Sequence, residues 1–263
     1  MAILESRKQT GISWVKESIA LFKQSPRKLM MLAMIYITIF VMLPAALSSL
    51  IFVVLTILLF PAFIVIAMLC YQNLDKKTTQ TLPEMLAKIQ PKMQQLMLLG
   101  AVSLLYGIII SYFLSSDMQW LAKVSQAVQA KTPMSEQQAS LMIEKGLPIL
   151  LKMMLFSAPL LFVTWFSPML IALNNYPLIK AIKSSIAGAI QYTVAMGVAG
   201  FILVLALVLL MLAMGIIAVF LGKLMPASAQ FVMSLLVFGW LLIATAIMLA
   251  FQYVSYRDVF RAA

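Results

Sequence analysis

Six apolar runs dominate this chain, and each is about 18 residues long or longer, which is enough for a helix to cross a bilayer. An open sheet leaves backbone groups unpaired in lipid, so a run of this kind is expected to be helical. The sequence therefore predicts six transmembrane helices. Their expected bounds are about 29–47, 49–71, 96–114, 153–173, 193–221 and 231–254.

The composition agrees with a membrane protein. Of the 263 residues, 63% are hydrophobic and 10% are charged, whereas soluble domains are about 45–50% apolar and about 25% charged. Because the apolar runs follow one another with short polar connections, we expect a single integral membrane domain over residues 1–263. The predicted fold class is an all-α, polytopic membrane protein.

A short amphipathic basic stretch precedes each pair of apolar runs, at residues 12–25, 82–92 and 177–191. Such stretches are typical of helices that lie in the membrane interface. The first and third align residue by residue, with 15–20 matching 182–187. The sequence thus predicts three repeated units, each an interfacial amphipathic helix followed by a helical hairpin.

Lys and Arg are unequally divided between the two sides that six spans define. With the N-terminus inside, 14 of the 19 Lys and Arg residues lie inside and five lie outside. The positive-inside rule then predicts that both termini are cytoplasmic. We interpret the net charge of +11 as attraction to anionic lipid headgroups, not to nucleic acid. The candidate residues for docking headgroups or a protein partner are Lys16, Lys23, Arg27, Lys28, Lys88, Lys92, Lys180, Lys183 and Arg257.

The largest outer segment, residues 115–148, is predicted to be a helical hairpin on the outer surface. Ser116 is a suitable cap for its first helix, and Thr132–Pro133 is suited to open the second. Gly146 and Pro148 are expected to end that second helix. The segment is too small to form an independent domain.

Side chains that carry catalysis or bind metals are scarce. The chain has no His, one Cys (Cys70) and eight acidic residues, all outside the expected spans. A Ser-His-Asp triad and a His-metal site are therefore excluded. Arg257 and Asp258 follow the last span, where we expect them to face lipid headgroups. We expect no enzymatic activity, no metal and no cofactor.

Prolines interrupt several of the expected spans, and a proline inside a helix removes a hydrogen bond and bends the helix. The simpler interpretation is that these bends help a six-helix bundle to close. The alternative is a cavity or hinge, as at the broken helices of transporters. The candidate cavity or hinge residues are Pro61, Ser157, Pro159, Thr164, Ser167 and Pro168.

Four segments carry a resemblance to a known family: 14–27, 165–173, 177–185 and the terminal 256–260. In these segments the chain resembles the YciC-like family of uncharacterised six-span bacterial inner-membrane proteins. That family is similar to the membrane domain fused to some glycerophosphodiester phosphodiesterases. The resemblance implies a bacterial inner-membrane location and the six-span topology. It implies no phosphodiesterase activity, which belongs to a separate soluble domain in the fused proteins.

Two hypotheses about function remain open. The first is a non-enzymatic protein with an organising, adaptor or partner role in the envelope or in membrane homeostasis, bound to lipid, to a protein partner or to a second copy of itself. The second is a carrier, or a transporter subunit, for a lipid or small amphipathic solute. Such a carrier needs no intramembrane charge relay, and none is visible in the expected spans. A mid-depth groove lined by Ser157, Thr164 and Ser167 favours the carrier, whereas a solidly packed bundle argues against it.

Overall fold

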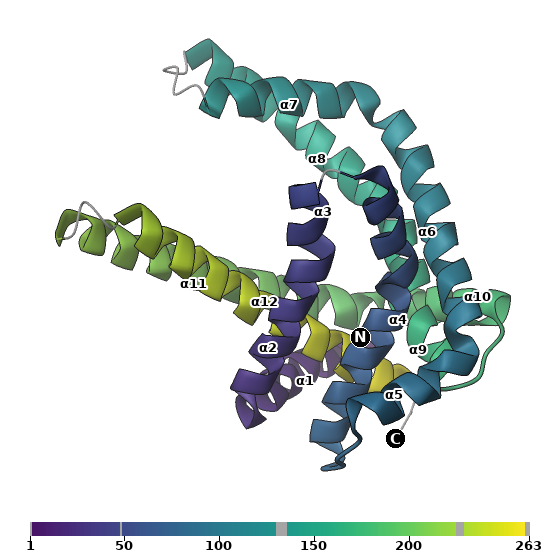
Figure 1. Cartoon of the computed structure of the whole chain (residues 1–263). Helices are drawn as coiled ribbons and strands as arrows, with labels where there is room; N and C mark the ends of the chain where they lie inside the picture. Colours follow the sequence, from purple (N-terminus) through teal and green to yellow (C-terminus); the bar gives the residue numbers. More distant parts are fainter. Residues whose placement is uncertain (1, 48, 130–135, 225–228, 261–263) are drawn as a thin grey trace.

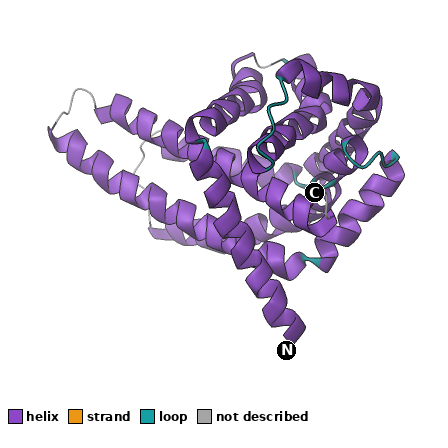
Figure 2. Ribbon diagram, turned by 90° about the horizontal axis from the view of Figure 1, so that it is seen from below, coloured by secondary structure: helices purple, strands orange, loops and turns teal. Residues whose placement is uncertain are grey.

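The computed structural model describes residues 2–47, 49–129, 136–224 and 229–260, and every regular element among them is a helix (Figures 1 and 2). Most helices are long and are joined by short loops. In chain order they are α1 (Ala2–Gln24), α2 (Pro26–Ile37), the π-helical turn η1 (Thr38–Met42), α3 (Leu43–Leu47), α4 (Leu50–Asp75), α5 (Leu82–Ile89), the 3-10 turn η2 (Gln90–Lys92), α6 (Met93–Phe113), α7 (Ser115–Gln129), α8 (Glu136–Thr164), α9 (Ser167–Ala172), α10 (Leu178–Gln191), α11 (Thr193–Leu224) and α12 (Ala229–Phe260).

Six helical segments in the described part of the chain are long and apolar enough to span a membrane. This confirms the prediction of an all-helical chain with six candidate spans. The segments extend past the apolar runs because each helix continues through polar residues at its ends. They are Pro26–Leu47, Leu50–Asp75, Leu82–Phe113, Glu144–Ala172, Thr193–Lys223 and Gln230–Phe260.

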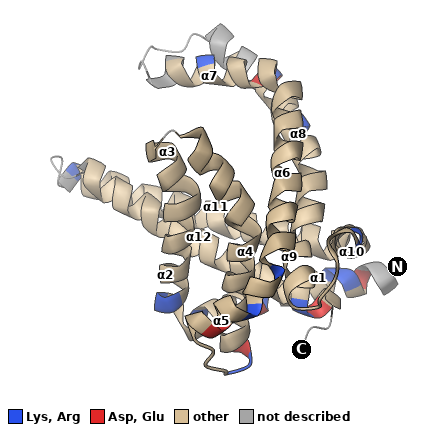
Figure 3. Cartoon of the chain, turned by 45° about the vertical axis from the view of Figure 1, so that its right-hand side comes forward, with Lys and Arg blue, Asp and Glu red and all other residues tan. Residues whose placement is uncertain are grey.

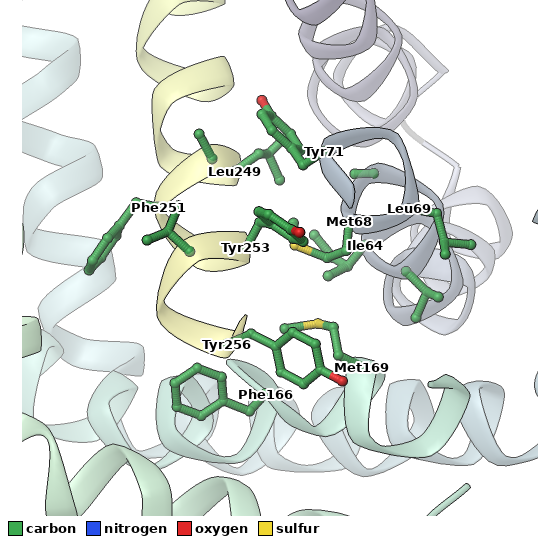
Figure 4. Close-up of a cluster of buried hydrophobic side chains, with 14 of the residues drawn as sticks. Ile64, Met68, Leu69, Tyr71, Phe166, Met169, Leu249, Phe251, Tyr253 and Tyr256 are labelled. Carbon is green, nitrogen blue, oxygen red and sulfur yellow. The ribbon is translucent and has the colours of Figure 1, made fainter. Parts of the chain in front are cut away.

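The buried core lies at the end of the molecule that carries both termini. The last turns of α12 are the centre of this core, since residues 251–256 are all buried and α12 contacts α1, α2, α4 and α11. Figure 4 shows Tyr253 and Tyr256 of α12 extending toward Met68 of α4 and Met169 of α9. The long helices are therefore joined to one another mainly at this end, which we call the base.

Away from the base the helices diverge. In Figure 1 the α11–α12 hairpin extends to the left, away from the upright α2–α4 hairpin and from α6 and α8. Its far half exposes large apolar side chains, including Ile216 at 73% and Phe220 at 65%. Such exposure is costly in water and is tolerated in lipid, because lipid tails are as apolar as these side chains.

The short helices α1 and α10 pack against the spans through small or buried residues. α1 contacts α11 and α12, and Trp14 and Ser18 on that face are fully buried. α10 buries Ala181 and Ser185, while Ile179 is 68% exposed. Ile182 of the same helix packs against the buried core, so α10 presents apolar side chains both toward the protein and away from it.

The outer segment differs from its prediction. The first helix, α7, is present, but Gly146 and Pro148 do not end the second helix: α8 continues through both to Thr164. An internal proline removes one hydrogen bond, and the rest of the helix is retained around it. Thr132–Pro133 lies outside the described residues. Asp117 of α7 and Lys152 of α8 form an ion pair of 2.6 Å.

The fourth span is also interrupted where a continuous helix was expected over residues 153–173. α8 ends at Thr164, and α9 begins at Ser167 with Pro168 in its first turn. Proline suits that position, since the first helical N–H groups lack intrahelical partners. The break therefore falls at Trp165–Phe166.

Replacing Gly100 by Ala tests the packing of α6 on α4. A Cβ at Gly100 lies 2.7 Å from both the Cα and the carbonyl oxygen of Leu58, which are backbone atoms that cannot turn aside. We expect Gly100→Ala to destabilise the protein by about 1–3 kcal/mol. Gly107→Ala on the same helix is the control: its Cβ meets nothing within 4 Å, so stability is unchanged or rises by up to about 1 kcal/mol. Thermal unfolding in detergent, followed by circular dichroism, measures both. Equal melting temperatures for the two variants contradict this close approach.

Candidate functional site

Arg257 lies at the centre of a charged cluster at the base, formed with Glu17, Asp75 and Asp258 (the basal cluster). Its NH1 group donates to Asp75 Oδ2 at 3.0 Å, and its Nε donates to Asp258 Oδ1 at 3.0 Å. Its NH2 group donates to Glu17 Oε2. The guanidinium of α12 is thereby bound to carboxylates from α1 and α4, and its five N–H donors suit several acceptors at once.

Two aromatic donors complete the cluster. The fully buried Trp14 of α1 donates from Nε1 to Asp258 Oδ2 at 2.8 Å. The hydroxyl of Tyr253 donates to Asp75 Oδ2 at 2.9 Å. One guanidinium does not neutralise three carboxylates, so these neutral donors stabilise the remaining negative charge. The cluster joins α1, α4 and α12 by side-chain bonds.

The structure does not place Arg257 and Asp258 as the sequence suggested. We expected both to face lipid headgroups, but they point toward α1 and α4. Arg257 therefore uses its donors within the chain. The other docking candidates form no ion pair with a described residue, although the ammonium of Lys180 lies 4.1 Å from the ring centroid of Tyr176. Its partners Asp75 and Glu17 lie 182 and 240 positions away. No local pattern indicates contacts over such separations.

A second group of bonds holds the break in the fourth span. Ser185 of α10 accepts from the backbone N–H of Phe166 at 3.1 Å and donates to the carbonyl of Phe162 at 2.6 Å. Gln252 of α12 donates to the carbonyl of Trp165 at 2.8 Å. These backbone groups, exposed by the end of α8, are thus paired inside the protein, as membrane depth requires.

The six candidate cavity or hinge residues do not form one site. Pro61, Ser167 and Pro168 are buried in helix contacts, whereas Ser157 and Pro159 are exposed. The hydroxyls donate to carbonyls four positions earlier in the chain, as at 2.8 Å from Thr164 to Leu160. These bonds are the common use of hydroxyls in apolar helices. The corresponding bonds of Ser157 and Ser167 go to Met153 and Val163.

Two large grooves lie elsewhere, and none of those six residues lines either of them. One groove, of about 640 Å³, lies between the far halves of α11 and α12 beside Trp240. The other, of about 710 Å³, lies between α2, α4 and α5 and extends from Lys28 to Ile39 along α2. Sequence reasoning missed both, because each groove is formed by helices whose relative angle the sequence pattern does not give.

The remaining docking candidates surround the base as exposed cations, which we call the basic collar. None of them forms an ion pair with a described residue, and all are exposed except the half-exposed Lys92. Figure 3 shows Lys and Arg gathered at this end over α2, α5 and α10. The basic collar consists of Lys16, Lys23, Arg27, Lys28, Lys88, Lys92, Lys180 and Lys183.

Most acidic groups at the same end are already bound. Glu17, Asp75 and Asp258 belong to the basal cluster, and Glu84 accepts from the backbone N–H of Thr81 at 3.0 Å in a capping box. These bonds do not remove the charge of the carboxylates, which offset part of the field of the basic collar, but the eight cations of the collar outnumber them. This surface attracts anions such as lipid phosphates.

Comparisons of the chain with protein-family models, with curated proteins and with solved structures find no match. The resemblance to the YciC-like family therefore stays a prediction from the residues. Among the described residues, no group of three or more His, Cys, Asp or Glu side chains is placed to hold a metal ion. The basic collar and the basal cluster are therefore the two candidate functional features of the base.

Replacing Arg257 by Gln tests the basal cluster. Three carboxylates then lose their cation in a partly buried site. We therefore expect the free energy of unfolding to fall by about 3 kcal/mol, the lower end of the range for breaking a buried ion pair. Arg27→Gln is the matched control: Arg27 is exposed and forms no ion pair with a described residue, so its effect stays within about 0.5 kcal/mol. Denaturant unfolding in mixed micelles gives both values. Similar stabilities for the two variants show that the cluster does not hold the base together.

Proposed function

We propose that this chain is a non-enzymatic, multi-pass protein of a bacterial inner membrane with an organising or adaptor role, and that its basic collar binds anionic lipid headgroups. The observation that carries the proposal is the collar itself: exposed cations without ion-pair partners among the described residues, gathered at one end of six candidate spans. Each Lys or Arg held near an anionic membrane surface contributes about 1 kcal/mol of attraction.

The orientation belongs to the same proposal. The base faces the cytoplasm, because cations accumulate on that side of membrane proteins and because the cytoplasmic leaflet is anionic. Both termini are then cytoplasmic. The collar residues come from α1, α2, α5, η2 and α10, so short helices that precede each hairpin contribute to it. This distribution is consistent with three repeated units of interfacial helix and hairpin.

An organising role suits a platform whose shape is fixed. The basal cluster holds α1 against α4 and α12 through Glu17 and Trp14, while Lys16 and Lys23 on the same helix stay exposed. The cations are thus presented on a helix that is bound to the spans. A protein partner with an acidic surface, or a second copy of the chain, is accommodated by the same surface.

The absence of an enzymatic activity is part of the proposal. It is supported by a chain without His and by the engagement of Asp258 in structural bonds with Trp14 and Arg257. The carrier hypothesis draws no support from its own candidate residues, since Ser157 and Pro159 are exposed and the buried Ser167 donates its hydroxyl to the carbonyl of Val163.

Cysteine labelling tests the orientation. In a Cys70→Ala background, which removes the one native thiol, Lys8→Cys and Lys123→Cys place single thiols at exposed positions of α1 and α7. In intact cells we expect a membrane-impermeant maleimide that has crossed the outer membrane to label Lys123→Cys and to leave Lys8→Cys unlabelled until the cells are lysed. The reverse pattern contradicts a cytoplasmic base.

Charge reversal tests the role of the collar. The variant Lys16→Glu/Lys23→Glu/Lys180→Glu/Lys183→Glu removes exposed cations from α1 and α10, and Lys123→Glu/Lys145→Glu/Lys223→Glu is the control at exposed positions far from the base. The protein is extracted with its surrounding lipid in polymer nanodiscs, and the lipid is quantified by mass spectrometry. We expect the first variant to lose at least half of the enrichment of phosphatidylglycerol and cardiolipin over the bulk membrane. The control keeps it, and equal enrichment in both variants refutes headgroup binding by the collar.

A further inference from the structure

The groove between α2, α4 and α5 has one polar end and an apolar length. At the base its wall includes Lys28 of α2, Asn73 of α4 and Thr78 of the following loop. Farther along, the wall is formed by side chains such as Ile35 and Ile66. A ligand that fits this groove is itself amphipathic, with a polar head at the base.

The length of the groove matches one leaflet of a bilayer. Along α2 it extends from Lys28 to Ile39, which at about 1.5 Å per residue is about 16 Å. Half of a hydrocarbon core of about 30 Å is about 15 Å. Its volume of about 710 Å³ lies within the range of about 300–1,000 Å³ that is typical of small-molecule sites.

The far end of the groove is formed by irregular and aromatic structure. Ile39 belongs to η1, and single π-helical turns within α-helices are frequent at functional sites. Phe63, on the opposite wall, contacts Tyr36 and Phe40 at ring-centroid distances of 5.8 and 5.2 Å. This aromatic cluster packs beside the far end, so the groove is a bounded site on the helix surface.

The polar end is preformed and positively charged. Asn73 donates to the carbonyl of Gln80 at 3.1 Å and accepts from Thr78 at 2.9 Å, which holds the loop from α4 to α5. Lys28 is exposed and pairs with no described acid. The acids nearest in sequence to this loop are engaged: Asp75 binds Arg257, and Glu84 binds the backbone of Thr81. An anionic head therefore meets an unopposed cation.

We propose that this groove binds one anionic glycerophospholipid, with its phosphate at Lys28 and the loop, and with one acyl chain along Ile35 and Ile66. This site is distinct from the diffuse attraction of the basic collar, because it combines one cation with a bounded apolar channel. A bilayer supplies such a molecule in the right orientation, since Met31 and Ile35 of the groove wall are exposed along α2, a candidate span.

Lipid titration followed by native mass spectrometry tests the site in the detergent-purified full chain. Phosphatidylglycerol is the probe, and phosphatidylcholine is its zwitterionic comparison. We expect one tightly bound phosphatidylglycerol per chain and about fivefold weaker binding of phosphatidylcholine. Lys28→Ala weakens the binding of phosphatidylglycerol about fivefold and leaves the binding of phosphatidylcholine unchanged. Ile35→Trp, which fills the channel, weakens the binding of both lipids about tenfold.

Matched controls separate the groove from the rest of the surface. Lys123→Ala removes an exposed cation of α7 that lies outside both the groove and the basic collar, and Ile109→Trp enlarges an exposed residue of α6. Both are expected to bind lipid within twofold of the native chain. If Lys28→Ala and Ile35→Trp bind lipid as tightly as these controls, the proposal is overturned. A lipid-free dimer in which a second copy fills the groove also overturns it.

Cys70 provides a second readout that needs no substitution, because the one thiol of the chain lies in the wall of the groove. We expect phosphatidylglycerol to slow its alkylation by N-ethylmaleimide several-fold, and phosphatidylcholine at equal concentration to do so less. Unchanged alkylation in saturating phosphatidylglycerol overturns the site. Loss of collar-dependent enrichment alone leaves this site intact, so the two proposals fail separately.

Discussion

The bonds of Arg257 are the constraint on which the arrangement at the base depends. One guanidinium on α12 binds carboxylates from α1 and α4, and Trp14 and Tyr253 donate to the same carboxylates. In lipid, apolar side chains alone give helices little reason to associate, because lipid tails are equally apolar. Directional polar bonds at the edge of the membrane therefore decide which helices meet. The other residues of the base, including the buried residues 251–256, pack around these bonds.

This arrangement divides the charges of the base into two groups. The carboxylates Glu17, Asp75 and Asp258 are bound to Arg257, whereas the cations of the basic collar have no ion-pair partner among the described residues. The exposed cations outnumber the carboxylates, so the surface of the base is positive. Lys28 at the mouth of the groove likewise has no ion-pair partner among the described residues, because the ion pair of nearby Asp75 is with Arg257. A structural cluster thus sets the electrostatics of both proposed lipid contacts.

Local sequence predicted the parts of the fold that a bilayer dictates. The six runs were recognisable because length and apolarity alone define a span. The prediction that Gly146 and Pro148 end a helix was wrong, because a helix with supporting neighbours tolerates residues that would end an isolated helix. The break at Trp165–Phe166 lies between the candidate hinge residues Thr164 and Ser167, but its stabilising partners, Ser185 and Gln252, were not predicted because they are distant in sequence.

By itself, then, the sequence determined that the chain is helical, that six of its segments suit a membrane and that its cations gather beside particular segments. Each of these properties depends only on residues that are close to one another in the sequence. Only the tertiary structure decided that Arg257 turns inward, that the candidate cavity residues do not converge and that α2, α4 and α5 enclose a groove ending at Lys28. These depend on the angles at which helices cross and on contacts between residues up to 244 positions apart, and no periodicity along the chain encodes either one.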